Sequence, residues 1–284
     1  MKTKKYLLYV AAGCLCATIS LPSCGSRRQD AGIRTETLRV DTTLCLDGSS
    51  TVPSCKLKLD FAYLQPSSED DSLTDHLNRR IIASGFGGRY GKDTPEAFVR
   101  HFTADYLEEY RTDVEPLYKE DRKRGTATED LPAWYNYEYE FTTRLEEGAA
   151  GVINYTIQSF MYTGGAHPNT VIQCLNFDRR TGRVLPKEEV FDMNRQTDIC
   201  GLLLQAIIEE SNRKMETDTI TSLQGLQTYG ILLDGTAFIP DNFLLQKEAV
   251  TFVYNNYDIA PYSAGRFILS LPNSALQPYF KNQN

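Results

Sequence analysis

The chain has 284 residues, of which 41% are hydrophobic and 24% are charged, and its formal net charge is −7. A chain of this size and composition can bury a core without disulfides, as one large domain or two modest ones. The acidic balance excludes the extended basic face that nucleic-acid binding requires, so we expect no nucleic-acid partner.

The N-terminal segment has the pattern of a secretory signal. Lysines near the start precede a mostly apolar run, Tyr6–Leu21. The sequence Leu-Pro-Ser-Cys that ends at Cys24 then resembles a lipobox, which predicts a lipoprotein signal peptide over residues 1–23 and a lipid on Cys24. Cys14, after Ala-Ala-Gly, is the alternative lipidation site. We expect a lipid-anchored cell-envelope protein, periplasmic or surface-exposed, that contacts the membrane through its N-terminal lipid.

Removal of residues 1–23 removes three lysines and no acid, which leaves 27 basic and 37 acidic residues and a net charge of −10. This charge serves solubility and also suits a basic partner. Residues 24–37 are polar and are interpreted as a tether between the lipid and the folded part.

A first α+β domain is predicted over residues 38–147. Strands are expected over 38–46 and 56–63, the second with apolar and charged residues in alternation. A helix is expected over 68–82. Thr94 followed by Pro95 begins a further helix, which Pro116 is expected to end.

Cys45 and Cys55 flank a turn-rich segment, LDGSSTVPS, that could bring them together. An exported location permits a disulfide between them. Whether the two cysteines are bridged stays open from the sequence.

A second α+β domain is predicted over residues 148–284. The strands of a meander are expected over 134–145, 151–161 and 171–178, and a helix over 197–215 is expected to cover one face of that sheet. Three closing strands follow, over 238–245, 249–254 and 266–271. The predicted fold class is therefore α+β, with two packed subdomains in which antiparallel sheets are covered by helices.

Two loops carry the candidate binding residues. The first, Tyr162–Asn169, reads YTGGAHPN and has two interpretations. In the structural one, its adjacent glycines allow a tight reversal between strands, and His167 and Asn169 cap backbone groups. In the functional one, Tyr162, His167 and Asn169 contact a ligand. The second, Asn255–Gly265, is rich in tyrosine and is rigidified by proline, as recognition loops often are. The candidate ligand-binding residues are Tyr162, Gly164, Gly165, His167, Asn169, Tyr257, Pro261 and Tyr262.

Several catalytic templates are missing from the sequence. It has no G-x-S-x-G elbow, no H-E-x-x-H helix and no paired CxxC, and its three histidines fall in different predicted elements. We therefore assign no catalytic residue, metal or cofactor, and the sequence favours a binding protein over an enzyme. The alternative is a cell-wall hydrolase that uses His167 with Asp178 or Asp258, which requires these side chains to meet within hydrogen-bond reach.

Four segments resemble a known family, the RsiV-type C-terminal domain. They are YTGGAHPN, NFDRRTGRVL (Asn176–Leu185), EVFD (Glu189–Asp192) and YDIAPYSAGRFILSLP (Tyr257–Pro272). This domain occurs in the anti-sigma factor RsiV, beside the catalytic domain of the deacetylase PdaC, and in lipoproteins of unknown function. Residues 38–147 are similar to the PdaC-type domain that usually precedes it.

The resemblance implies an α+β fold for both halves. It also implies an extracytoplasmic binding module, whose partner would be a cell-wall glycan or a wall-acting basic protein such as lysozyme. Neither deacetylation nor sigma-factor regulation is expected, because the sequence shows no deacetylase motif and no sigma-binding segment.

Overall fold

The structure, a computed structural model, describes residues 32–48, 53–68, 71–233 and 235–281. From Ile33 onward the described residues form one compact unit. The predicted signal peptide and the two candidate lipidation cysteines lie outside the described residues. Within the described ranges, no helix is both long enough and apolar enough to cross a membrane.

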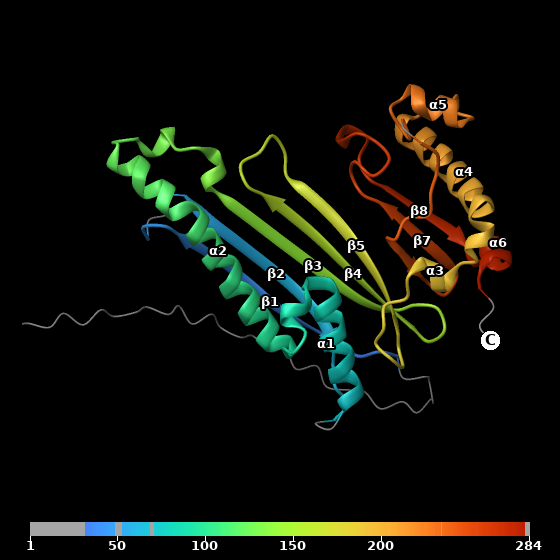
Figure 1. Ribbon diagram of the computed structural model, residues 1–284, viewed down its shortest axis with the longest axis horizontal. Helices are drawn as coiled ribbons and strands as arrows, with labels where there is room; N and C mark the ends of the chain where they lie inside the picture. The colour runs from blue at the N-terminus through green and yellow to red at the C-terminus, as the bar shows by residue number, and fades with distance from the viewer. Residues whose placement is uncertain (1–31, 49–52, 69–70, 234, 282–284) are drawn as a thin grey trace, which may run out of the picture. The chain divides into compact units, whose positions relative to one another are not determined.

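The larger of two sheets has five strands in the order β1-β2-β3-β4-β5 (Figure 1). They are β1 (Thr35–Cys45), β2 (Ser54–Leu64), β3 (Tyr137–Glu147), β4 (Val152–Tyr162) and β5 (Asn169–Asp178). The predicted β3-β4-β5 meander is confirmed, because each of its strands pairs antiparallel with the next. The pair β2–β3 is parallel, which the sequence did not predict. Parallel neighbours need a long crossover connection, and here the connection contains two helices.

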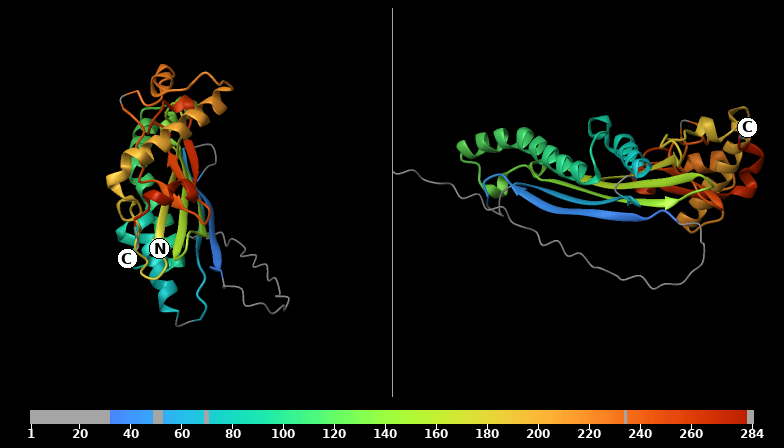
Figure 2. Two further views of the ribbon diagram at one scale, coloured as in Figure 1. Left: turned by 90° about the vertical axis from the view of Figure 1, so that its right-hand side faces the viewer. Right: turned by 90° about the horizontal axis from the view of Figure 1, so that it is seen from below.

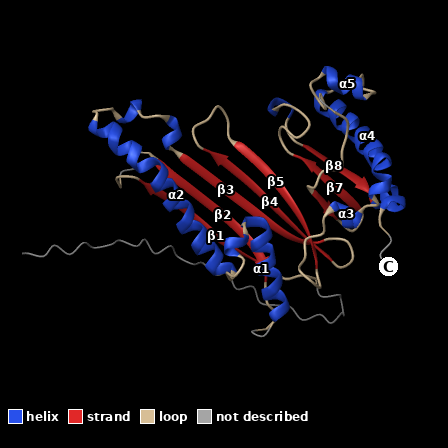
Figure 3. Cartoon of the chain, viewed as in Figure 1, coloured by secondary structure: helices blue, strands red, loops and turns tan. Residues whose placement is uncertain are grey.

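The two crossover helices, α1 (Ser72–Phe86) and α2 (Pro95–Lys123), cover one face of this sheet (Figures 2 and 3). The side chain of Thr94 accepts a hydrogen bond from the amide of Ala97, so this residue caps α2 as predicted. Beneath the helices lie the alternate apolar side chains of β2, with Leu57, Leu59 and Phe61 all buried. The period-two pattern of the sequence therefore identified the inner face of β2 correctly.

The prediction that Pro116 ends its helix is wrong, because α2 continues to Lys123. Proline within a helix removes one backbone hydrogen bond and costs roughly 3 kcal/mol. Val114 and Tyr118, on either side of it, are buried in a cluster with Tyr110 and Tyr135. The hydroxyl of Tyr118 also donates to Asp47 at 3.0 Å. Packing on both sides of the proline thus offsets the lost bond.

The smaller sheet has the order β6-β7-β8, and all its neighbours are antiparallel. Its strands are β6 (Phe243–Leu245), β7 (Ala249–Tyr254) and β8 (Phe267–Pro272). The three closing strands are confirmed, although β6 is shorter than predicted. The helix α4 (Gln196–Met215) packs on this sheet rather than on the meander, which corrects the expected placement.

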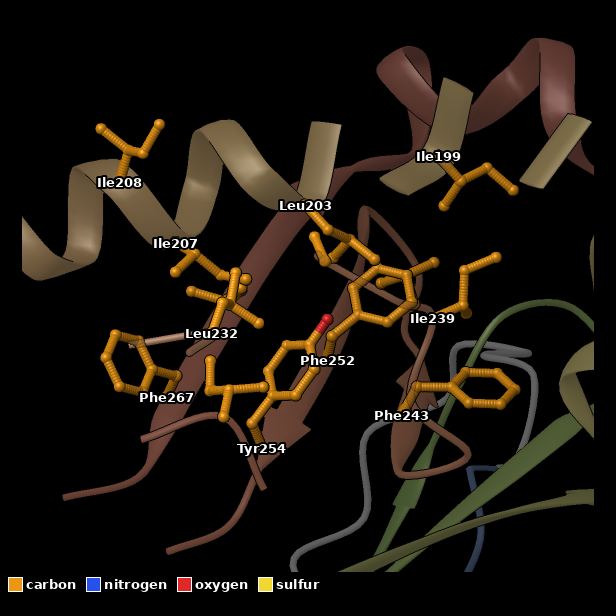
Figure 4. Packing of buried hydrophobic residues seen from close by; sticks show 14 of the residues in the cluster. Ile199, Leu203, Ile207, Ile208, Leu232, Ile239, Phe243, Phe252, Tyr254 and Phe267 are labelled. Carbon is orange, nitrogen blue, oxygen red and sulfur yellow. The ribbon is translucent and has the colours of Figure 1, made fainter. Parts of the chain in front are cut away.

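The core between α4 and the smaller sheet is almost entirely aliphatic and aromatic (Figure 4). Ile199, Leu203 and Ile207, which lie along one side of α4, face Phe252 and Phe267 of the sheet. Three shorter helices surround this core, namely α3 (Lys187–Val190), α5 (Leu223–Thr228) and α6 (Asn273–Leu276). The α+β fold class is confirmed.

The predicted domain boundary between residues 147 and 148 lies in the turn from β3 to β4, two strands of one sheet. Both Cys45 and Cys55 are free thiols, so the possible disulfide is not formed. The strand register explains this, because Cys45 faces Ser54 while Cys55 faces Leu44. Neighbouring register positions point to opposite faces of a sheet. Burial of the Cys55 thiol beneath α2 also raises its pKa to about 12.

Three asparagine side chains join the two sheets. Asn176 of β5 donates to the carbonyl of Phe243 and accepts from the amide of Leu245, both at 2.8 Å. In the opposite direction, Asn242 accepts from the amide of Cys174 and donates to the carbonyl of Ile172. A carboxamide carries one acceptor and one donor group, so it can pair with a strand as a peptide group does.

Asn255 completes the junction by pairing with both backbone groups of Ile172, at 2.8 and 2.9 Å. The sheets are therefore connected by side chains that pair with facing backbones, and not by a continuous ladder. We call these three residues the asparagine junction.

Asn176→Ala is expected to lower the free energy of unfolding by about 2–6 kcal/mol. Asn176 is buried, and its loss leaves a buried carbonyl and a buried amide without partners, at about 1–3 kcal/mol for each group. Asn176→Asp should also destabilise, because it places a carboxylate against the Phe243 carbonyl. Urea unfolding measures both, with the exposed Ser270→Ala of β8 as control. A change below about 0.5 kcal/mol for Asn176→Ala would show that these hydrogen bonds contribute little to the stability of the protein.

Candidate functional site

The two loops predicted to carry binding residues contact each other through their side chains. The ring of His167 stacks on Tyr262, with centroids 3.9 Å apart and planes 17° from parallel. Its Nε2 lies 3.1 Å from the hydroxyl of Tyr257. The hydroxyl of Tyr262 donates to the carbonyl of Pro168 at 3.3 Å. We call His167, Tyr257 and Tyr262 the aromatic cluster.

The contacts of His167 define which ring nitrogen carries the proton. Nδ1 lies 3.1 Å from the carbonyl of Pro168, which can only accept, so Nδ1 is the protonated nitrogen. Nε2 is then free to accept from the hydroxyl of Tyr257. The imidazole is held in one tautomer and one orientation by its own loop and by the facing loop.

Gly164 fixes the path of the first loop. Its φ is +78°, and a Cβ there would lie 2.2 Å from the backbone nitrogen of Trp134. Only glycine combines this backbone conformation with so close an approach. The next residue, Gly165, has no positive φ, and its nearest neighbour would be 3.9 Å away. The glycines that looked equivalent in the sequence therefore differ, and only Gly164 is required by the geometry.

Two cationic side chains hold the second loop in place. The ammonium of Lys214, on α4, donates to the carbonyls of Ala264 and Arg266, and it lies 4.0 Å from the centre of the Phe267 ring. Burial lowers the pKa of this lysine. The guanidinium of Arg266 donates to the hydroxyl of Thr170 on β5, which ties the second loop to the strand that follows the first.

Two bulky residues near the cluster have left-handed backbones. Tyr257 has φ 73° and Leu232 has φ 54°. Side chains of this size rarely adopt positive φ, and such residues persist only where surrounding contacts enforce them. Here the amide of Leu232 donates to the carbonyl of Ile259 at 2.7 Å, and the amide of Tyr257 donates to Ala260 at 3.2 Å. Backbone strain of this kind concentrates at binding and catalytic sites.

Both strained residues line an open cleft of about 590 Å³. Its wall is mostly apolar and includes Leu233, Phe238 and Tyr257, whose exposed fractions are 62%, 43% and 62%. Among the described residues that line the cleft, Asp258 alone is charged. Several large apolar side chains exposed around one concavity mark a binding surface, whereas scattered ones do not.

The structure gathers some of the predicted site residues and separates others. His167, Tyr257 and Tyr262 form the aromatic cluster, and Pro261 lines the cleft. Tyr162 and Asn169 instead lie at the ends of strands, opposite Glu138 and Met161 respectively. Neither makes a hydrogen bond to the cluster in the part of the chain that is described.

Sequence reasoning missed the cleft residues Leu233 and Phe238 and the supporting Lys214. The one local signal for the cleft is an apolar pair, Leu232 and Leu233, in a short segment flanked by glycines. The sequence around Lys214 did not indicate its supporting role, because a cationic residue in the last turn of a helix is common.

The partners expected for a hydrolase are engaged elsewhere. A carboxylate oxygen of Asp258 accepts from the amide of Asn255, and Asp178 accepts from the amides of Arg180 and Thr181. His167 is paired with tyrosines instead. Over the described residues, no three His, Cys, Asp or Glu side chains gather closely enough to hold a metal ion. The two loops thus form an ordered aromatic surface beside an apolar cleft. The hydrolase alternative stays a prediction.

These features define a class of protein, an α+β fold that displays a two-loop aromatic surface, and the comparisons with known proteins agree on that fold. The family described as "Protein of unknown function (DUF3298)" matches residues 189–274, which include the second loop. A DUF3298 family member from Bacteroides fragilis NCTC 9343, solved at 2.30 Å, shares 30% identity with a TM-score of 0.77. The match covers 88% of this chain and 95% of that one. The chain therefore belongs to the DUF3298 family.

A second solved structure, a DUF3298 family protein from Pseudomonas aeruginosa PAO1, has 17% identity and a TM-score of 0.56. That match covers 89% of this chain and 96% of that one, and at this identity it shows the shared fold alone. No curated protein matches the sequence.

Gly164→Ala is expected to destabilise the protein by more than about 1 kcal/mol, because alanine at positive φ is strained and its Cβ would meet the Trp134 backbone. Gly165→Ala is the matched control and should be close to neutral. Trp134 is the single tryptophan of the chain, so its fluorescence reports on this contact directly. Equal spectra and equal unfolding midpoints for the two variants would contradict the role of Gly164.

Proposed function

We propose that the chain is an extracytoplasmic, lipid-anchored binding module that recognises cell-wall glycan through the aromatic cluster and the adjoining cleft. The observation that carries this proposal is the meeting of two distant loops, in which His167 stacks on Tyr262 and pairs with Tyr257.

The chemistry of the surface suits a neutral sugar. A pyranose ring has a face of C–H bonds and an edge of hydroxyls. Tyrosine offers a complementary apolar ring with a polar tip. Tyr257 is exposed and lines the cleft, and its hydroxyl, which donates to His167, can still accept a hydrogen bond from a ligand. The apolar wall formed by Leu233 and Phe238 would take the methyl group of an N-acetyl substituent.

The placement in the cell envelope rests on the N-terminal segment. Its lysines, its apolar run and the lipobox-like sequence that ends at Cys24 support export and lipid attachment. The resemblance to RsiV-type and PdaC-type domains also supports an extracytoplasmic role at the cell wall. The same resemblance and the net acidic charge keep a basic, wall-acting protein such as lysozyme as the second partner to test.

The proposal is tested by co-sedimentation with purified peptidoglycan and by calorimetric titration with soluble N-acetylated oligosaccharides. Tyr257→Ala and Tyr262→Ala should each weaken binding about tenfold, because aromatic anchors dominate binding energy at such surfaces. Leu117→Ala removes an exposed apolar side chain from α2 and serves as the matched control.

A parallel pull-down with lysozyme separates the two partners. Retention of lysozyme with no retention of glycan would indicate that the chain recognises a protein and not a glycan. Retention of neither, at both low and moderate salt, would contradict the binding proposal altogether.

A further inference from the structure

The outer edge of β1 is an open site for strand pairing. This strand is terminal in the five-stranded sheet, and within the described ranges no strand lies on its far side (Figures 1 and 2). It is long for an edge strand, running from Thr35 to Cys45. An exposed edge of this length presents a row of unpaired backbone groups that can pair with another chain.

The register of β1 with β2 shows which backbone groups are free. The amide of Leu46 donates to the carbonyl of Pro53, and the amide of Gln65 donates to the carbonyl of Arg34. Both bonds join residues that lie directly opposite each other, and the register between them has no bulge. In an antiparallel pair, every second residue forms the hydrogen bonds to its partner strand. The even-numbered residues of β1 therefore form the hydrogen bonds to β2. The odd-numbered residues, which include Arg39 and Asp41, therefore direct their amides and carbonyls to the open edge.

We propose that two copies of the chain form a two-fold symmetric dimer by antiparallel pairing of β1 with β1, centred on Val40. This register aligns the strands over their whole length, with Thr35 opposite Cys45 of the second copy. It also places odd-numbered residues opposite one another, which lets their free backbone groups form the hydrogen-bonded pairs.

Charge selects the same register. With Val40 at the centre, Arg39 of each copy lies opposite Asp41 of the other. A two-fold register centred on Arg39 would place two arginines opposite each other, and one centred on Asp41 would place two aspartates together. Like charges directly opposite in a strand pair are destabilising, and opposite charges are favourable.

The neighbouring strand extends this alternation. Arg39 already pairs with Asp60 of β2 at 3.3 Å, and Asp41 lies opposite Lys58. Across the four central strands of the dimer the charges would run Asp60, Arg39, then Asp41 and Lys58 of the second copy. All four side chains stand on the face away from α1 and α2. The proposal is independent of the glycan site, which lies on other elements.

Reversing the charges tests the interface in the full chain, kept in mild detergent. Sedimentation velocity over a wide range of concentration should show a concentration-dependent dimer. Arg39→Asp and Asp41→Arg should each weaken dimerisation at least about tenfold, because each places two like-charged pairs across the interface. The fourfold variant, with Lys58→Asp and Asp60→Lys added to Arg39→Asp and Asp41→Arg, restores opposite charges both between the copies and within each copy, and should restore the dimer. Lys56→Ala is the control, since Lys56 is exposed on the same face of β2 but lies opposite Thr43, outside this row of charges.

Cross-linking tests the register itself. In this register, Val40 of one copy lies directly opposite Val40 of the other. No backbone hydrogen bonds join such a pair, and its side chains are close enough for a disulfide. Val40→Cys should therefore give a 40–40 cross-link under mild oxidation, identified by peptide mass spectrometry. Thr42→Cys, on the same face of β1, should give no 42–42 cross-link, because it lies opposite Leu38. A chain that stays monomeric at every concentration, or failure of the fourfold variant to restore the dimer, would overturn the proposal.

Discussion

The asparagine junction is the constraint on which the rest of the structure depends. Asn176, Asn242 and Asn255 each pair with backbone groups of the opposite sheet, and in this way the last strand of the larger sheet is joined to the smaller one. Strand pairing alone could not make this connection, because β5 and β6 are not neighbours in either sheet. Since the first loop precedes β5 and the second follows β7, the junction also brings the two loops together.

The aromatic cluster is held on both sides before any ligand arrives. The close approach of Gly164 to Trp134 fixes the first loop, and Lys214 with Arg266 fixes the second. Ordering a loop during binding weakens affinity, so a surface whose ordering is complete in the folded protein binds more tightly. The left-handed backbone of Tyr257 is consistent with this, because its strain is offset by packing elsewhere in the fold.

Local chemistry was readable from the sequence, and long-range geometry was not. The alternation of Leu57, Leu59 and Phe61 and the cap at Thr94 depend on nearby residues, and both were predicted correctly. The passage of α2 through Pro116 depends on buried neighbours from other elements, so the local rule for proline failed. The two loops were recognised separately, but their contact depends on side chains that cross between sheets. An exposed asparagine and a bridging one look alike in a sequence.

The parallel pair β2–β3 has a consequence for how the chain reaches this fold. Its strands are separated by both crossover helices, so the centre of the larger sheet closes only when distant parts of the chain meet. Contacts of such high sequence separation form slowly, because the entropy of loop closure opposes them. During synthesis, the β1–β2 hairpin therefore leaves the ribosome with both of its edges open. Until β3 arrives, the nascent hairpin exposes the outer edge of β2 as well as that of β1. During that interval the charged side chains of β1 and β2 protect it from aggregation.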